Sequence, residues 1–415
     1  MTLTIIISIL AFLAVTLLLV GLLLFAKAKL TTSGDVTINI NDGEKVITTE
    51  SGSTLLTTLA ENKVFLPSAC GGGGSCGMCK CQVLEGGGDI LPTETGFINR
   101  RMQKEHWRLG CQVKVKENLK IAVPESVLGV KKWECEVVSN HNVATFIKEF
   151  VVKLPAGENL NFRSGGYIQI DIPKYEAIKF ADMDIDDQFH SDWDKFKMWG
   201  LITKNPEDTF RAYSMANHPA EGNIIMLNIR IATPPFDRVN GGFMKLNPGI
   251  CSSYVFSRKP GDKVTISGPY GEFFVKDTPN EKMFIGGGAG MAPMRSHIFH
   301  LFKTLKTDIP VSFWYGARSK AEIFYQDQFE EIAREFPNFK FAIGLSEPKP
   351  VDNWDPKYVG FIHQVIFNNY LKNHENPEDI EYYLCGPPMM TAAIVKMLDN
   401  LGVPAENIMY DNFGA

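Results

Sequence analysis

Four cysteines form the most distinctive pattern in the chain. Cys70, Cys76 and Cys79 lie on a glycine-rich stretch, and Cys111 follows further along. An iron–sulfur cluster needs thiolates at fixed spacing and backbone N–H groups near the sulfurs, and glycine lets the backbone approach that closely. The pattern therefore predicts a [2Fe–2S] centre with these four ligands. A structural zinc site also takes four cysteines, but usually as two C-x-x-C pairs, and only one such pair is present.

A fifth cysteine complicates the choice of ligands. Cys81 would share a strand face with Cys79 and could replace it. Only Cys79 is separated from Cys76 by two residues, so the spacing favours Cys79. The loop resembles those of ferredoxins. Its first gap of five residues is similar to the adrenodoxin-like spacing rather than to the plant-type one.

A second candidate site begins at Arg211-Ala212-Tyr213-Ser214. Arginine can hold a flavin diphosphate by paired hydrogen bonds, tyrosine can stack on an isoalloxazine ring, and a serine hydroxyl can reach the flavin N5. Four such residues also make an ordinary strand. The string resembles the R-x-Y-S motif of ferredoxin–NADP reductases, and the resemblance implies FAD binding by Arg211, Tyr213 and Ser214, with Ser214 also catalytic.

A motif further along fits the same resemblance. In that family a string like the one at residues 249–253 opens a short helix whose N–H groups cap the FAD pyrophosphate. The string 268–273 resembles the turn that closes the flavin barrel. The FAD-binding residues implied by the first of these strings are Gly249, Cys251, Ser252 and Ser253.

Two strings predict a nicotinamide site. A glycine-rich turn between a strand and a helix, at residues 286–293, presents N–H groups to a pyrophosphate. The string Cys385-Gly386-Pro387-Pro388 resembles the C-G-P-P motif of the same reductases, which places Cys385 beside the nicotinamide as a catalytic residue. A buried free cysteine is also common as a small apolar side chain. The predicted NADH-binding residues are Gly287, Gly288, Gly290, Met291, Pro293, Cys385, Gly386 and Pro387.

Two features leave the dinucleotide site less defined. Reductases of this kind often finish on an aromatic residue that covers the flavin, and Phe413 is the candidate for this catalytic role. Arg318 and Ser319 would suit a 2′-phosphate, whereas Glu322 would repel one. The residues alone leave NADH and NADPH nearly equal, and the resemblance implies NADH.

The elements that position these residues fall into three folded parts. Residues 35–128 contain an alternating hairpin, a short helix, the cysteine loop and a strand at 80–85, and residues 107–115 predict a strand carrying Cys111. This indicates a β-grasp-like, ferredoxin-like α+β domain. Residues 129–278 predict an antiparallel β-barrel for the flavin. Residues 279–415 alternate strands with helices, which predicts a doubly wound α/β domain for NADH.

One segment interrupts the barrel. Between residues 174 and 206 the strand pattern stops, and the segment carries several aspartates and aromatic residues. Long insertions are often peripheral, so we favour a solvated surface loop. A docking surface for a partner subunit is the alternative.

The N-terminus is strongly apolar. Residues 2–26 contain no charged side chain, and as a helix they are long enough to cross a bilayer. Lys27 and Lys29 follow, so the positive-inside rule places the rest of the chain in the cytoplasm. We therefore expect a retained transmembrane anchor at residues 1–26 and a linker at 27–34. A cleaved signal peptide would start with a cationic residue, which is absent.

Composition excludes one class of function. The chain has 415 residues, 45% of them hydrophobic and 21% charged, and a net charge of −5. A nucleic-acid-binding protein would need a basic face, so this class is disfavoured.

The combination of anchor, insertion and motifs resembles, over essentially the whole chain, the family of F subunits of sodium-translocating NADH:quinone reductases. The resemblance implies an oxidoreductase of the bacterial inner membrane that takes hydride from NADH on FAD. Single electrons then pass through the [2Fe–2S] cluster to membrane partner subunits and finally to ubiquinone, while the complex transports sodium. Two alternatives remain: a membrane-tethered reductase of an oxygenase system, and a non-catalytic iron–sulfur sensor or scaffold.

Overall fold

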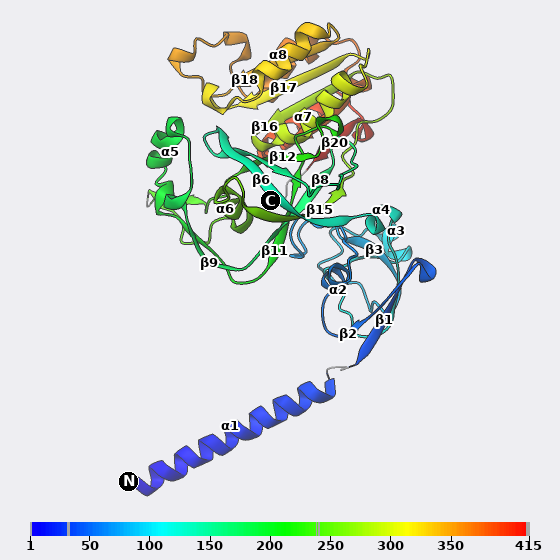
Figure 1. Cartoon of the computed structure of the whole chain (residues 1–415), viewed down its shortest axis with the longest axis vertical. Helices are drawn as coiled ribbons and strands as arrows, with labels where there is room; N and C mark the ends of the chain where they lie inside the picture. Colours follow the sequence, from blue (N-terminus) through cyan, green and yellow to red (C-terminus); the bar gives the residue numbers. More distant parts are fainter. Residues whose placement is uncertain (1, 31–33, 238, 240, 412–415) are drawn as a thin grey trace. The chain divides into compact units, whose positions relative to one another are not determined.

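The computed structural model describes residues 2–30, 34–237, 239 and 241–411. The chain divides into two compact units, one made of residues 1–68 and 72–129 and the other of residues 69–71 and 130–415. Figure 1 draws both, coloured along the sequence.

The N-terminal segment forms helix α1, Thr2–Leu30. At about 1.5 Å per residue its length is about 43 Å. The structure describes the side chains of residue 7 and residues 9–22 in this helix, and all of them are exposed. Within the part of the chain that the structure describes, no helix has both the length and the apolarity that a membrane crossing requires. Other side chains of the predicted anchor, residues 1–26, lie outside the described residues.

The first unit is built on a five-stranded sheet in the order β2-β1-β5-β3-β4. The predicted hairpin is confirmed, because β1 and β2 pair antiparallel and the alternating Val36, Ile38 and Ile40 are buried. Thr54 caps the following helix by accepting a hydrogen bond from the Thr57 N–H. The elements are β1 (Asp35–Ile40), β2 (Lys45–Glu50), α2 (Leu55–Glu61), β3 (Lys80–Glu85), α3 (Arg100–Lys104), β4 (Trp107–Leu109), β5 (Leu119–Ala122) and α4 (Glu125–Leu128).

The expected strand around Cys111 is shorter than predicted. Strand β4 ends at Leu109, and Cys111 lies in a turn. The chain turns there because the Gly110 N–H donates to the Cys79 carbonyl and the Gln112 N–H donates to the Leu109 carbonyl, both at 2.8 Å. The prediction that a strand carries Cys111 is therefore wrong.

The second unit begins with the predicted antiparallel barrel. Six strands follow the order β11-β8-β15-β6-β7-β12, and a bridge between Met215 and Leu227 brings the two edge strands together. The core is the apolar inner face of these strands together with α6. The elements are β6 (Lys131–Ala144), β7 (Ile147–Lys153), β8 (Tyr167–Ile172), β11 (Thr209–Ser214), β12 (Ile224–Arg230), β13 (Phe236–Asp237), β14 (Gly242–Phe243), α6 (Ile250–Phe256) and β15 (Lys263–Tyr270).

The insertion at residues 174–206 packs onto this barrel. Phe180, Trp193 and Met198 are buried in the same apolar cluster as the barrel strands, and the Trp193 indole N–H donates to the Thr145 carbonyl at 2.9 Å. The buried Lys148 ammonium donates to the Asp184 carbonyl. The interpretation as a solvated loop is therefore wrong, because the aromatic side chains extend the core. The insertion contains β9 (Tyr175–Lys179), α5 (His190–Lys195) and β10 (Ile202–Asn205).

The rest of the second unit is a doubly wound parallel sheet in the order β18-β17-β16-β19-β20. Helices α7 and α8 cover one face, and α9 and α10 cover the other. The last strand, β20, was not expected from the sequence. The elements are β16 (Lys282–Gly287), α7 (Met291–Phe299), β17 (Val311–Ala317), α8 (Gln326–Glu335), β18 (Phe339–Leu345), α9 (Ile362–Asn369), β19 (Glu381–Cys385), α10 (Pro388–Asn400) and β20 (Ile408–Asp411).

Candidate functional site

Two of the predicted cluster ligands meet beside strands β3 and β4. Cys79 directly precedes β3 and Cys111 follows β4, and the pairing of Lys80 with Leu109 holds the strand ends together. Both cysteines are buried. A hydrogen bond with Cys111, and then burial, raise the pKa of the Cys79 thiol well above its ordinary value. The fold therefore brings this pair into contact.

The glycines of the loop explain how its backbone is shaped. Gly72, Gly74 and Gly77 have φ values of 88°, 76° and 67°, which favour glycine. A Cβ on Gly77 would lie 2.3 Å from the Phe97 ring. The Gln112 amide donates to the Cys111 sulfur at 3.5 Å.

The donor set agrees with a [2Fe–2S] cluster, which four thiolates hold with N–H donors aimed at the sulfurs. Cys76 is partly buried, as is Cys70 at the start of the loop. Across residues 2–30, 34–237, 239 and 241–411, no group of three or more His, Cys, Asp or Glu side chains has the spacing to hold a metal ion. The assignment of Cys70, Cys76, Cys79 and Cys111 stays a prediction.

Cys81 lies on β3 in a different environment. It is fully buried and is paired in register with Arg108. Burial raises the pKa of the Cys81 thiol to about 12, although the Arg108 charge lowers it. Arg108 itself is held in a buried ion pair with Glu94 at 2.8 Å. This agrees with a structural role for Cys81.

The first group of predicted flavin residues, Arg211, Tyr213 and Ser214, lies on strand β11. Arg211 and Tyr213 are partly buried, and Ser214 is buried. Within the described part of the chain, the Arg211 guanidinium donates through one nitrogen to the Thr209 hydroxyl at 3.3 Å and to the Phe210 carbonyl at 2.8 Å. It therefore keeps donors for a diphosphate.

The start of α6 carries the second group of predicted FAD residues. Gly249 precedes the helix, and a Cβ there would lie 2.5 Å from the Ala232 Cβ. Ser252 accepts a hydrogen bond from the Ala232 N–H at 3.0 Å and donates to the Gly249 carbonyl. The hydroxyl of Ser253 is buried and has no partner among the described residues. Burial raises the pKa of the Cys251 thiol to about 11. An unsatisfied donor beside Arg211's strand fits a FAD site.

The two predicted nicotinamide loops pack directly against each other. Gly290 precedes α7, and a Cβ there would lie 2.1 Å from the Cys385 carbonyl oxygen, so only glycine permits this approach. Gly288 has a φ of 57°. Met291 and Pro293 are buried within α7. The ends of β16 and β19 thereby form one edge, where ligands of open α/β sheets bind. Of the other predicted residues, Gly287 ends β16, and Gly386 and Pro387 follow β19.

One residue of this site was missed by the sequence reasoning. Asp411, on β20, pairs in register with Cys385 and accepts a hydrogen bond from the Ser214 hydroxyl at 2.6 Å. Burial raises the pKa of the Asp411 carboxyl, against the hydrogen bond from Ser214. Burial and then the Asp411 charge raise the pKa of the Cys385 thiol well above its ordinary value. Asp411 thus binds Ser214 of β11 and lies on the strand next to Cys385 of β19, so it links residues of the predicted flavin and nicotinamide sites.

Two other predictions concern the dinucleotide. Glu322 accepts a hydrogen bond from the Thr145 hydroxyl at 2.6 Å and pairs with Arg318 at 3.4 Å. The carboxylate is therefore held in place beside Arg318, where it would oppose a 2′-phosphate. Phe413 lies outside the described residues.

Three family models match the chain. They are a 2Fe-2S iron–sulfur cluster binding domain over residues 38–116, an oxidoreductase FAD-binding domain over residues 199–275, and an oxidoreductase NAD-binding domain over residues 284–396. The three predicted cofactors are therefore supported by matching domains.

Curated relatives match over nearly the full length. The chain is 56% identical over 405 residues to the F subunit of the Na(+)-translocating NADH-quinone reductase of Actinobacillus succinogenes, with 97% of each chain covered. It is equally identical to the protein of the same name in Neisseria meningitidis, with 99% of each chain covered.

Solved structures share the fold. The Amycolatopsis cytochrome P450 reductase GcoB has a TM-score of 0.62 at 22% identity, covering 91% of this chain and 98% of that one. The ferredoxin reductase in carbazole 1,9a-dioxygenase has a TM-score of 0.58 at 25% identity, covering 92% and 98%.

Proposed function

Because the chain belongs to the family of Na(+)-translocating NADH-quinone reductase F subunits, we propose that it is the NADH-oxidising subunit of such a complex. The observation that carries the proposal is the meeting of Ser214, Cys385 and Asp411, which joins a flavin strand to a nicotinamide edge. Full-length relatives named as quinone reductase subunits disfavour the alternative of an oxygenase reductase. The three cofactor domains likewise disfavour a non-catalytic sensor.

When bound, FAD would supply the acceptor for a hydride from NADH and the means of passing its two electrons on one at a time. The chain's own residues bind and orient the reactants. Arg211 and Ser253 are the proposed donors to the FAD diphosphate, because each keeps hydrogen-bonding capacity in the fold. The flanking positions proposed for FAD are Tyr213, Gly249, Cys251 and Ser252.

Ser214 is the proposed hydrogen-bonding group at the flavin N5. Its hydroxyl donates to Asp411 in the structure, which leaves the Ser214 oxygen as an acceptor suited to the N5–H of a reduced flavin. Because its raised pKa keeps the Cys385 thiol neutral, Cys385 brings no charge to the site and acts as an apolar wall that excludes water. Gly287, Gly288, Gly290, Gly386 and Pro387 are proposed to line the NADH pocket beside Cys385.

Electrons are proposed to leave through the cysteine loop. Cys70, Cys76, Cys79 and Cys111 would hold the cluster as thiolates, and the Gln112 amide would donate to the Cys111 sulfur. Hydrogen bonds to cluster sulfurs raise the reduction potential, so Gln112 would tune the cluster. The electron acceptors would be membrane partner subunits, with ubiquinone reached indirectly.

Helix α1 is proposed as a single-pass anchor in the bacterial inner membrane. Residues 2–26 lack charged side chains, and the helix extends over 29 residues. Because Lys27 and Lys29 follow this segment, the positive-inside rule favours an orientation in which the folded parts face the cytoplasm. Residues 2–26 contain no charged side chain that could line a path for sodium ions. Sodium transport would therefore belong to the partner subunits.

The test is the visible spectrum of the full-length chain in detergent, purified with its cofactors. On anaerobic addition of NADH we expect the flavin absorbance to bleach and the absorbance of an oxidised [2Fe–2S] cluster to fall with it. Flavin bleaching without any cluster response would contradict the proposed electron path. Absence of bleaching would contradict NADH oxidation itself.

A further inference from the structure

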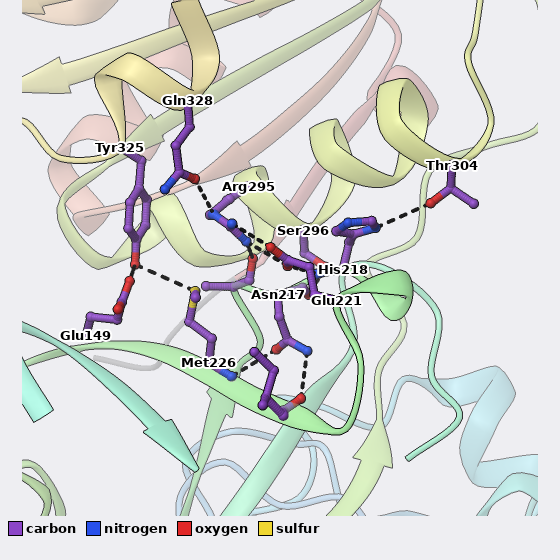
Figure 2. Close-up of polar contacts among 12 residues, drawn as sticks. Glu149, Asn217, His218, Glu221, Met226, Arg295, Ser296, Thr304, Tyr325 and Gln328 are labelled. Atoms are coloured by element: carbon purple, nitrogen blue, oxygen red, sulfur yellow. Dashed lines mark hydrogen bonds and ion pairs between the residues drawn. The ribbon is translucent and has the colours of Figure 1, made fainter. Parts of the chain in front are cut away.

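A network of polar contacts joins the barrel to the nicotinamide sheet within the second unit. Figure 2 shows its side chains pointing toward one another from both sides. We call it the seam network. On the barrel side it contains Glu149, Asn217, His218, Glu221 and Met226, and on the nicotinamide side it contains Arg295, Ser296, Thr304, Tyr325 and Gln328.

Arg295 makes the most contacts in this network. Its guanidinium binds both carboxylate oxygens of Glu221, at 2.8 and 2.6 Å. It also donates to the Ala216 carbonyl at 2.9 Å and to the Gln328 side chain at 3.0 Å. The Arg295 Cζ atom lies over the Phe299 ring, 4.1 Å from its centre. These contacts fix the planar guanidinium in one orientation. A lysine ammonium has no such plane and could not make the same set of directed hydrogen bonds.

The Glu221 carboxylate stays ionised in this environment. Burial alone would raise its pKa, but the hydrogen bonds and charge of Arg295 lower the pKa below its ordinary value. His218 beside it is kept neutral, because burial lowers its pKa. The Arg295–Glu221 contact is therefore a charged, bidentate pair.

The contacts of Arg295 connect the end of strand β11 with the glycine-rich loop before α7. The strand end lies only a few residues from the atoms that Arg295 binds, and the loop lies only a few residues from Arg295 itself. Ala216 lies two residues beyond Ser214 at the end of the flavin strand. Arg295 lies about one turn into α7, the helix that begins at the glycine-rich dinucleotide loop. The Ser296 hydroxyl adds a second link by donating to the Asn217 carbonyl at 2.8 Å. A shift at Arg295 would therefore move both ends of the reaction site relative to each other.

The buried ion pair of Lys282 with Glu381 provides a comparison, because both of its residues belong to the same sheet. Lys282 and Glu381 pair at 2.9 Å and are almost fully buried. They belong to the neighbouring strands β16 and β19, so they hold the nicotinamide sheet alone. Buried ion pairs are weak evidence for stability in themselves. What distinguishes Arg295 is that two of its partners, Glu221 and the Ala216 carbonyl, lie on the barrel side.

We propose that Arg295 is a positioning residue for hydride transfer: by clamping Glu221 and the Ala216 carbonyl, it sets where the dinucleotide loop lies against the flavin strand. The proposal rests on the proposed NADH oxidation and adds a residue that is not among those proposed to hold FAD or NADH. Misplacement by about 1 Å can cost on the order of a hundredfold in rate.

The test uses the full-length holoprotein with Arg295→Lys, which keeps the charge and loses the fork, and Glu221→Gln, which keeps the shape and loses the charge. Lys282→Gln is the matched control in the other buried pair. In stopped-flow experiments at saturating NADH, we expect flavin reduction to slow by about 10- to 100-fold in Arg295→Lys, and less in Glu221→Gln. The KM for NADH should change by less than about threefold.

Two further measurements do not depend on turnover. Amide hydrogen exchange of residues 214–221 should speed up in Arg295→Lys and stay unchanged in Lys282→Gln. FAD content should match that of the wild type in all variants. Lys282→Gln is expected to lower the melting temperature without slowing flavin reduction.

The outcomes separate the two proposals. If the wild type is not reduced by NADH, the proposed function fails. If the wild type is reduced and Arg295→Lys is reduced at the same rate, the positioning role alone fails. The positioning role also fails if Lys282→Gln slows reduction as much as Arg295→Lys does. If Arg295→Lys does not fold, a normal rate in Glu221→Gln overturns it.

Discussion

The predicted cysteine ligands and the Ser214–Asp411 contact both involve reactive side chains, but these are drawn from different distances along the chain. Three of the predicted cluster ligands lie within ten residues, and glycines with left-handed backbones bend the loop around them. Ser214 and Asp411 are 197 residues apart and meet only because barrel and sheet pack together. The first site depends on its own loop and on one strand pairing that brings Cys111 to Cys79, whereas the second depends on the packing of two large parts of the fold.

The largest expected effect would test the local site. Cys79→Ser removes a thiolate that the cluster needs, so the [2Fe–2S] absorbance should be lost while NADH still bleaches the flavin. Cys81→Ser is the matched control, since Cys81 is buried beside Arg108. It should keep the cluster. Equal cluster loss in both variants would remove the distinction between the two cysteines.

The next effect would test the long-range site. Ser214→Ala removes the hydroxyl that Asp411 orients, so flavin reduction at saturating NADH should slow by about a hundredfold. FAD content and the cluster spectrum should not change, because the loop is built independently of this contact. Thr265→Val, on β15 of the same barrel, serves as the control and should reduce normally. A normal rate in Ser214→Ala would show that the meeting with Asp411 is structural.

A smaller effect is expected at Phe413. Replacing it by serine removes the aromatic ring proposed to cover the flavin, so NAD⁺ should bind about tenfold more tightly, a gain of about 1.4 kcal/mol. Flavin fluorescence titrated with NAD⁺ measures this. Unchanged affinity together with unchanged fluorescence would contradict the covering role.

The smallest effect is on stability. The folded-state pKa of Asp411 is raised, so the folded protein binds more protons than the unfolded chain and loses stability as the pH rises through that pKa. Asp411→Asn removes this cost while keeping a hydrogen-bonding group. Its melting temperature should therefore exceed that of the wild type at pH 8, and the difference should vanish below about pH 4, the unfolded pKa of aspartate. Identical melting curves at both pH values would argue against the buried carboxyl.

The two sites also differ in how far the sequence could predict them. The cysteine spacing and the hairpin at residues 35–50 were predictable, because both depend on neighbours in the chain. Asp411 and Arg295 were not, since nothing near them in sequence marks a partner on another element. The insertion was misjudged for the same reason. Trp193 is buried by the barrel, and its own segment has no strand-like alternation that would indicate this.

Strand β20 has a consequence for how the protein is made. During synthesis, every other strand of the nicotinamide sheet emerges from the ribosome before residues 408–411 do. Until they pair, the backbone of β19 is an open sheet edge, which is prone to pairing with other chains. At that stage strand β20, which places Asp411 next to Cys385, would be missing from the sheet. The contact between Asp411 and Ser214 therefore cannot form until β20 has been made and has joined the sheet.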